Sequence, residues 1–440
     1  MAKYRDFDDD YRYDDEDDYE YIERKRSRSD KNRNVALERR AERKYDNRVK
    51  PKKPRKKMKR WVKVLICILE VIVLIGLVGT YYIVDKLGKI NIEIIDEEFI
   101  MDNKDEMDED TVKTLQGYTN ILLLGSDNRD NSVEALDKKL TNHTDAIIIC
   151  SINNDTKEIK LVSVYRDTVL KVTDPENTST SELRKITEAN FFYGTQASLN
   201  AINVNLDLNI TDYVMVNWSA LIDIIDAVGG IDIEITEEER EWLNAYLVDT
   251  SVNTGKKYEE VENSGYVHLD GIQATAYCRI RYTAGSDYKR TERQRTVLSK
   301  IFEKAKGMNL AQLNSAIDSV VGNISTSLSV GEIIEMASHL TKYSLAGTVG
   351  FPFEVDDTGV VMVNGKESDV VAPVDLKSNV SQLHQFLFGT ENYTPTATVQ
   401  DISKQISTAV IYPDQVTATE KSTEKATEQT TQKQTEKQTE

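Results

Sequence analysis

The sequence predicts a layered α/β/α domain with a mixed central sheet, preceded by one transmembrane helix. Apolar runs of strand length, rich in Ile, Leu and Val, recur along the chain, and amphipathic helical segments lie between them. These two observations predict the domain. The apolar run at 64–84 predicts the membrane span, because at about 1.5 Å per residue it would cross roughly 30 Å of hydrocarbon.

Changes in composition predict how the chain is organised. Residues 1–60 are acidic and then basic with few aliphatic side chains, so we expect a disordered cytoplasmic tail before a signal anchor at 61–84. An acidic extracytoplasmic stalk at 85–114 leads into one folded domain at 115–390, and 391–440 is expected to be a low-complexity extracytoplasmic tail. Basic residues before the span and acidic ones after it place the N-terminus in the cytoplasm. The span lacks a following small-residue cleavage site, which favours an uncleaved anchor.

Hydrophobic periodicity predicts the elements of the domain in order. We expect strands at 118–124, 145–152, 158–165, 212–218 and 231–235, and helices at 195–206, 218–228, 287–306 and 375–387. Gly229 and Gly230 end one helix before the strand that follows. Residues 278–282 are expected to be extended, which would point Arg279 and Arg281 to the same side of a strand.

A dense group of cations lies in this region although the chain carries a formal net charge of -18. The expected helix places Arg290, Arg293 and Gln294 on one face near its N-terminal end, opposite the pair formed by Arg279 and Arg281. Guanidinium groups bind phosphate oxygens in bidentate fashion, and a helix N-terminus adds unpaired N–H groups. Two facing arginine pairs therefore predict a pyrophosphate clamp. The alternative is a solvated charged surface.

Acidic residues lie at the ends of two expected strands. Asp127 follows the first strand and Asp145 begins the second. Carboxylates beside an arginine cluster can hold magnesium, which prefers oxygen ligands, whereas the alternative is that each aspartate caps a turn. The third strand ends in Arg166 and Asp167, which adds a cation and a carboxylate that could orient it.

In sequence order these motifs resemble the LytR-CpsA-Psr family of Gram-positive wall enzymes over roughly 117–390. The resemblance rests on several ordered motifs together with the signal-anchor topology. Its motifs are Asn120-Ile121-Leu122-Leu123-Leu124-Gly125-Ser126-Asp127-Asn128-Arg129, Thr144-Asp145-Ala146-Ile147, Ser163-Val164-Tyr165-Arg166-Asp167, Lys185-Ile186-Thr187-Glu188-Ala189-Asn190, Val228-Gly229-Gly230-Ile231, Leu269-Asp270-Gly271, Arg279-Ile280-Arg281 and Arg290-Thr291-Glu292-Arg293-Gln294.

The resemblance implies a phosphotransferase that moves an anionic glycopolymer from undecaprenyl pyrophosphate to peptidoglycan and forms a phosphodiester. It implies a polyprenyl chain in a hydrophobic tunnel, which the sequence does not locate. By position it implies magnesium at Asp127 and Asp145, catalytic roles for these two with Arg129 and Arg166, and pyrophosphate binding by Arg129, Arg166, Arg279, Arg281, Arg290, Arg293 and Gln294.

The chain departs from the family pattern at two positions. His143 stands where members usually carry arginine, so one cationic contact would depend on pH, and Tyr165 replaces a frequent proline. The expected partners are the lipid-linked glycopolymer, peptidoglycan and the lipid membrane of a Gram-positive cell envelope. The identity of the polymer, teichoic acid or capsule, stays open.

Phosphoryl transfer depends mostly on positioning and charge stabilisation, so a metal and arginines suffice without a Ser-His-Asp order or a Gly-rich phosphate loop. Asp127 and Asp145 are the candidate general bases. A non-catalytic scaffold that binds lipid pyrophosphate, or a hydrolase that uses water as acceptor, would need the same cationic cleft. Nucleic acid is not an expected partner, because the basic cytoplasmic segment lacks a helix-turn-helix pattern and runs directly into the membrane span.

Two further residue sets are ambiguous. Cys150 and Cys278 are the cysteines outside the span, and a disulfide between them is a minor expectation. Asn217 and Trp218 follow the fourth strand and could touch a ligand, although a tryptophan there is more often part of the core.

Overall fold

The computed structural model describes residues 39–40, 91–92, 95, 97–127, 140, 142–283, 285–320, 323–363 and 366–411. From Asn91 onward these residues belong to one compact unit. The expected transmembrane helix and nearly all of the expected cytoplasmic tail lie outside the described residues, as do residues 412–440. Within the ranges given, none of the helices has the length and apolar character to cross a membrane.

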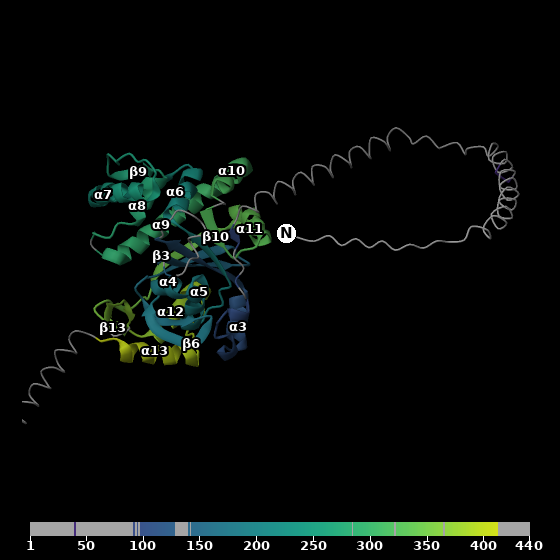
Figure 1. Cartoon of the computed structure of the whole chain (residues 1–440), viewed down its shortest axis with the longest axis vertical. Helices are drawn as coiled ribbons and strands as arrows, with labels where there is room; N and C mark the ends of the chain where they lie inside the picture. Colours follow the sequence, from purple (N-terminus) through teal and green to yellow (C-terminus); the bar gives the residue numbers. More distant parts are fainter. Residues whose placement is uncertain are drawn as a thin grey trace, which may run out of the picture. The chain divides into compact units, whose positions relative to one another are not determined.

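A mixed sheet of seven strands forms the centre of the domain (Figure 1). Strand β2 is antiparallel to β3 and parallel to β7, while β4 is antiparallel to β3 and parallel to β11. The mixed sheet that the sequence predicts is therefore confirmed. In spatial order the strands are β1 (Asn91–Ile92), β10 (Ile324–Thr326), β7 (Asp212–Val216), β2 (Tyr118–Ser126), β3 (Thr144–Asn153), β4 (Glu158–Val164) and β11 (Ser344–Phe351).

Side chains that alternate along the strands build a core on each face of the sheet. On β2, Leu122 and Leu124 belong to one cluster, which helices α5, α12 and α13 cover. Ile121 and Leu123 belong to the cluster on the other face, where Leu298 of α9 packs. Figure 1 shows α5, α12 and α13 on one side of the sheet and α6, α8 and α9 on the other. The layered architecture therefore follows from period-two alternation in buried strands.

The elements expected from periodicity are confirmed, with ends that agree to within two residues. They include the five expected strands, of which β8 (Ile231–Ile235) pairs with β9 outside the main sheet. The expected helices are α5 (Thr195–Leu206), α6 (Trp218–Ala227), α9 (Ser286–Lys306) and α12 (Leu376–Phe388).

The sequence pattern did not predict the remaining helices and strands. The helices among them are α3 (Glu109–Gln116), α4 (Thr187–Tyr193), α7 (Glu237–Thr254), α8 (Gly271–Cys278), α10 (Leu310–Val320), α11 (Val330–Ser338) and α13 (Ala397–Ala409), with short 3-10 turns η1 (Glu97–Phe99), η2 (Lys104–Glu106) and η5 (Leu340–Lys342). The strands are β5 (Val169–Asp174), β6 (Asn177–Lys185), β9 (Gly265–Leu269), β12 (Val355–Asp356), β13 (Val360–Val363), β14 (Lys366–Asp369) and β15 (Ala372–Pro373).

The extended segment expected at 278–282 is wrong. A capping box between Asp270 and Gln273 starts α8, and its apolar residues are buried against α6 and α7. The helix ends at Cys278, and Arg279 has helical φ and ψ values of -97° and -9°. Only Cys278 of the expected segment belongs to the helix. Arg279 forms a turn, and residues 280–282 have no strand pairing, so the alternation of side chains along a strand does not apply to them.

The expected domain limits of 115 and 390 are too narrow. On the N-terminal side, Ile100 and Met107 pack against the main core, and the buried Asn103 donates from Nδ2 to Asp207 Oδ1 at 2.7 Å. On the C-terminal side, α13 buries Val399, Ile402 and Ile406 in the same core. Helix α13 is short and has polar residues around it, so a domain boundary drawn from composition does not include it.

Candidate active site

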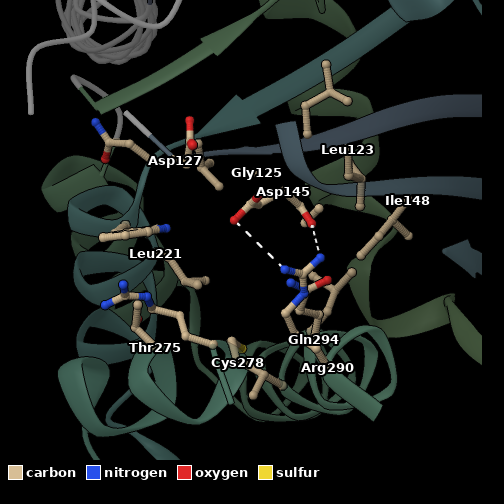
Figure 2. A pocket seen from close by; sticks show the side chains of 18 of the residues that line it. Leu123, Gly125, Asp127, Asp145, Ile148, Leu221, Thr275, Cys278, Arg290 and Gln294 are labelled. Atoms are coloured by element: carbon tan, nitrogen blue, oxygen red, sulfur yellow. Dashed lines mark hydrogen bonds and ion pairs between the residues drawn. The ribbon is translucent and has the colours of Figure 1, made fainter. Parts of the chain in front are cut away.

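A cavity of about 510 Å³ lies between the sheet and helices α6, α8 and α9 (Figure 2). Acidic and basic side chains from β3, α9 and the segments that follow β2, β4 and α8 line one part of it. Apolar side chains from β2, β3, β7, α6 and α9 line the rest. The charged residues are Asp127, Asp145, Arg166, Arg279, Arg281 and Arg290, and the aliphatic ones include Leu123, Ile148, Val214, Leu221, Ile224, Val297, Leu298 and Ile301.

Three arginines from separate segments converge on Asp145 at the start of β3. Arg166 Nη1 lies 2.5 Å from Asp145 Oδ1, and Arg281 Nη2 lies 3.2 Å from Oδ2. Arg290, on the first turns of α9, donates from Nη2 to the Asp145 backbone oxygen at 3.4 Å, and its Nη1 is 4.0 Å from Oδ2. Figure 2 shows Asp145 facing guanidinium groups across the cavity near Arg290 and Gln294. Here one carboxylate organises three cations.

The ionised groups of this cluster leave buried hydrogen-bond donors that suit an anion. Burial opposes ionisation of Asp145, but the nearby Arg290 and Arg166 outweigh that effect and lower its pKa, so the carboxylate is charged. Burial also lowers the pKa of Arg290, although two carboxylates near it act in the opposite direction. Within the described part of the chain, Arg290 Nε and Nη1 are buried without a hydrogen-bond acceptor. The three guanidinium groups pair with Asp145, Asp167 and Asp287, which balance their charge. The buried Arg290 donors that lack an acceptor among the described residues are the feature that suits phosphate oxygens.

Asp127 lies beside Asp145 at the end of β2. Its Oδ1 accepts a hydrogen bond of 2.8 Å from the backbone N–H of His143. Burial raises the pKa of Asp127, and the neighbouring charge of Asp145 raises it further. The imidazole of His143 stacks on Phe191 with ring centroids 4.4 Å apart. Two carboxylates that repel each other in one cavity would both be stabilised by a cation between them.

Asp127 and Asp145 supply carboxylate oxygens, which are the kind of donor that magnesium prefers. Magnesium is commonly held by one or two carboxylates, with waters and substrate phosphates completing the coordination. The described residues contain no group of three or more His, Cys, Asp or Glu side chains that could hold a metal by themselves. The donor set thus suits a metal that binds together with a phosphate rather than a closed structural site.

Arg279 does not form a pair with Arg281. Its Nη2 lies 2.5 Å from Asp249 Oδ2, and its Nη1 donates to Thr250 Oγ1 at 2.7 Å. The guanidinium also lies over the ring of Trp218, 3.7 Å from its centroid. Arg279 therefore lines the cavity on the side of α6 and α7, because α8 continues to Cys278 and turns successive side chains in different directions.

Arg293 does not lie with Arg290 at the cavity. The side chain is 4% exposed and is not among the residues that line the cavity. Its Nε donates to Glu239 Oε1 at 2.9 Å, Nη1 to the Ile280 oxygen at 3.1 Å, and Nη2 to Thr283 Oγ1 at 2.7 Å. Arg293 thus joins α9 to α7 and to the loop that carries Arg281. Neither expected arginine pair forms. Arg281 of the first pair and Arg290 of the second contact Asp145, whereas Arg279 and Arg293 bind elsewhere.

The remaining expected site residues are distributed as follows. Gln294 lines the cavity, and its buried Oε1 has no hydrogen-bond partner among the described residues. Arg129 lies outside the described residues. Asp167 Oδ2 accepts from Arg166 Nε at 3.2 Å, and its Oδ1 is 3.4 Å from Lys185 Nζ, so Asp167 contacts the arginine it was expected to orient.

The sequence interpretation gave no site role to several residues of the cavity wall, among them Asn217, Trp218 and Cys278. Asn217 and Trp218 line the cavity although the sequence favoured a place in the core. Cys278 also lines it and is a free thiol, as is Cys150, so the disulfide expected as a minor alternative is absent from the structure. Burial raises the pKa of the Cys278 thiol to about 12, which keeps it protonated and unreactive.

The chain matches the sequence model of the LytR_cpsA_psr family over residues 89–370, and it belongs to this family. A relative from Bacillus subtilis, the polyisoprenyl-teichoic acid–peptidoglycan teichoic acid transferase TagT, is 25% identical over 317 residues, which cover 70% of this chain and 91% of TagT. Biofilm regulatory protein A of Streptococcus mutans is 27% identical over 192 residues, 42% of this chain and 44% of that protein.

A crystal structure of a Streptococcus agalactiae protein has a similar fold. Its TM-score is 0.50 at 21% sequence identity, and the likeness covers 71% of this chain and 98% of that one. At this identity the comparison shows the shared fold alone.

Proposed function

We propose that this chain is a membrane-anchored extracytoplasmic phosphotransferase that moves an anionic glycopolymer from a polyprenyl pyrophosphate to peptidoglycan. One observation supports this most strongly: three guanidinium groups around Asp145 adjoin an aliphatic cavity wall. A lipid pyrophosphate joins a multiply charged group to a long apolar chain, and the cavity offers both environments side by side. The TagT and TagU relatives are named as transferases between polyisoprenyl-linked teichoic acid and peptidoglycan.

In this proposal the arginine cluster binds the pyrophosphate. Arg281 and Arg166 are partly exposed and pair with Asp145 in the absence of substrate. Phosphate oxygens can therefore accept hydrogen bonds from these two guanidinium groups when the substrate binds. The buried Arg290 supplies donors that lack an acceptor among the described residues. Because these charges are held in place before substrate binds, they stabilise developing charge on the leaving phosphate without reorganisation.

Asp127 and Asp145 would hold magnesium. When bound, the ion would supply further positive charge next to the phosphate oxygens. In the transfer, a hydroxyl of the acceptor glycan attacks the phosphorus that carries the glycopolymer. The bond from that phosphorus to the bridging oxygen breaks, polyprenyl monophosphate leaves, and the hydroxyl loses its proton to a base, for which the two carboxylates are the candidates. The phosphoanhydride of the carrier supplies the free energy, so no nucleotide is required.

The placement outside the cytoplasm rests on the sequence. The apolar run at 64–84 with its basic N-terminal flank supports a signal anchor, and the domain that follows it would face the cell wall. A lipid carrier would then meet the cavity from the membrane to which the chain is attached.

A reconstituted reaction tests the function. Full-length protein in detergent is incubated with a polyprenyl-pyrophosphate saccharide, peptidoglycan oligomers and magnesium, and lipid and glycan products are followed by mass spectrometry. Transfer predicts a glycan–peptidoglycan phosphodiester together with polyprenyl monophosphate. Free phosphorylated glycan would instead identify a hydrolase, and bound but unchanged lipid would identify a scaffold.

Two variants accompany this reaction. Arg281→Ala should abolish most of the transfer because it removes a guanidinium from the Asp145 cluster. Lys289→Ala is the matched control, since Lys289 is an exposed cation near the start of α9 that pairs with Glu292 and does not line the cavity. Equal rates for Arg281→Ala and Lys289→Ala would refute a role for the arginine cluster.

A further inference from the structure

We propose that Tyr165 is a positioning residue that holds two arginine-bearing segments at the spacing that a pyrophosphate requires. The inference rests on the proposed function, because the role is exercised on that substrate. Tyr165 departs from the family pattern and does not itself line the cavity. Arg166 follows it directly after β4, whereas Arg290 lies on the first turns of α9, and both arginines contact Asp145.

The backbone of Tyr165 is fixed against β11. Its N–H donates to the Phe351 carbonyl oxygen at 2.9 Å, and its own carbonyl oxygen accepts from the N–H of Thr168 at 2.9 Å. The first hydrogen bond continues the pairing of β4 with β11, and a proline could not donate it. The second closes a turn that contains Arg166 and Asp167. The direction in which Arg166 leaves the sheet therefore depends on how Tyr165 is seated.

The ring of Tyr165 packs on the N-terminal turn of α9. Its centroid lies 4.7 Å from that of Tyr288, and the two rings meet edge to face at 84°. The Tyr288 hydroxyl donates to Asp357 Oδ2 at 3.2 Å, which anchors this second ring as well. Arg290 lies two residues after Tyr288 on the same helix. One aromatic contact thus joins the segment of Arg166 to the segment of Arg290.

A neutral contact is useful here because the two guanidinium groups repel each other. Burial lowers the pKa of Arg290, and the nearby charge of Arg166 lowers it further. Asp145 offsets this repulsion, but phosphate oxygens and magnesium would compete for the same charged groups. The contact between Tyr165 and Tyr288 involves none of these charges, so it can keep the spacing of the two segments when substrate binds.

Gly350 on β11 makes the room that the Tyr165 ring occupies. A Cβ atom at residue 350 would overlap the Tyr165 hydroxyl oxygen and lie 2.6 Å from Cζ, and its three nearest atoms all belong to Tyr165. The φ angle of Gly350 is not in the left-handed region, so the backbone there accepts other residues. Gly350→Ala would therefore act on the ring and push it from its place against Tyr288.

The experiment measures a preference between two lipids. Full-length protein in detergent is titrated with a short-chain polyprenyl pyrophosphate and with the corresponding monophosphate, and calorimetry gives the two dissociation constants. Wild type should bind the pyrophosphate more tightly, because its second phosphate reaches the guanidinium groups of both segments. Gly350→Ala and Tyr165→Ala should each reduce this preference about fivefold. Tyr165→Phe keeps the ring and should stay within about twofold of wild type.

Two comparisons separate positioning from a general loss of stability. Gly347→Ala is the matched control on the same strand: its Cβ would meet the ring of Phe386 on α12 at 3.2 Å, so the preference should be unchanged. Gly350→Ala combined with Tyr165→Ala should cause no further loss, because the ring that it would displace is gone. Urea unfolding of each variant checks that it is folded at the temperature of the titration.

Each outcome supports or overturns the role. An unchanged preference in Gly350→Ala, an equal loss of affinity for both lipids, or a further loss in the double variant would overturn it while the pyrophosphate site stands. If Gly350→Ala does not fold, Tyr165→Ala and Tyr165→Phe decide, and equal preferences in these two would refute the role. If wild type shows no preference for the pyrophosphate, the proposed function fails and the positioning role fails with it.

Discussion

Replacement of Arg293 by alanine should destabilise the protein, although the motif around it predicts a ligand contact. The guanidinium is 4% exposed and donates to Glu239, to the Ile280 carbonyl and to Thr283. It therefore ties α9 to α7 and to the loop that carries Arg281. Its loss would leave the Glu239 carboxylate, whose side chain is 16% exposed, without its cation.

The expected cost follows from these contacts. Hydrogen bonds to a charged donor contribute about 1.5–3 kcal/mol each, and Arg293 makes three. Removing one partner of a buried ion pair costs about 3–5 kcal/mol because the remaining charge is left uncompensated. Water that enters the space offsets part of the hydrogen-bond loss. We therefore expect Arg293→Ala to lower the free energy of unfolding by about 3–5 kcal/mol.

Urea unfolding followed by tryptophan fluorescence measures this cost, since Trp242 lies on α7 itself. Arg281→Ala is the control: its side chain is 38% exposed and makes one ion pair, so its free energy of unfolding should change by about 1 kcal/mol or less. A double-mutant cycle with Glu239→Gln, which retains an acceptor for the α7 cap, should give a coupling energy of about 1–3 kcal/mol.

The reasoning fails if Arg293→Ala unfolds like wild type but loses affinity for polyprenyl pyrophosphate to the same degree as Arg281→Ala. That result would restore Arg293 to the pyrophosphate site and would contradict its contacts in the structure. Loss of stability with little further loss of affinity at low temperature would support the structural role.

Three further predictions concern the site and the core. Asp145→Asn should slow transfer by about 100-fold or more, because the charge that orders three guanidinium groups is lost, and the exposed Asp155→Asn should leave the rate unchanged. Burial lowers the pKa of His384 to about 4, since its imidazole is enclosed against Tyr393, and its Nε2 donates to the Leu206 carbonyl oxygen. The unfolded chain binds the proton more readily, so stability should be full above about pH 6.5 and fall by roughly 3 kcal/mol as the pH drops to about 4. Calorimetry across this range should show a flatter slope for His384→Phe. Removal of 397–440 deletes the three buried aliphatic side chains of α13 and should cost about 5 kcal/mol or more, whereas removal of 412–440 should leave the melting temperature unchanged.

The local sequence pattern predicts helices and strands where it is clear, and it fails where it is ambiguous. The strands that contain Leu122 and Ile149 are long apolar runs between turn residues, and they were predictable. Residues 278–282 were expected to be extended, but α8, which packs against α6 and α7, ends at Cys278, and the residues after it form a turn and a loop. A misassigned element then turns every side chain on it in a wrong direction, which is why Arg279 and Arg281 do not form a pair.

The sequence by itself determined the class of fold, the family and the residues that could carry charge to the site. Only the tertiary structure decided which of them meet. Asp145 and Arg281 lie 136 positions apart in the chain, and no periodicity specifies that contact. Arg290 and Arg293 share one helix, yet Arg290 contacts Asp145 at the cavity while Arg293 contacts Glu239 of α7, and helical spacing alone does not specify these neighbours. The aliphatic wall likewise exists only when β2, β3, β7, α6 and α9 pack together, since each element contributes a few residues that have no ligand chemistry alone.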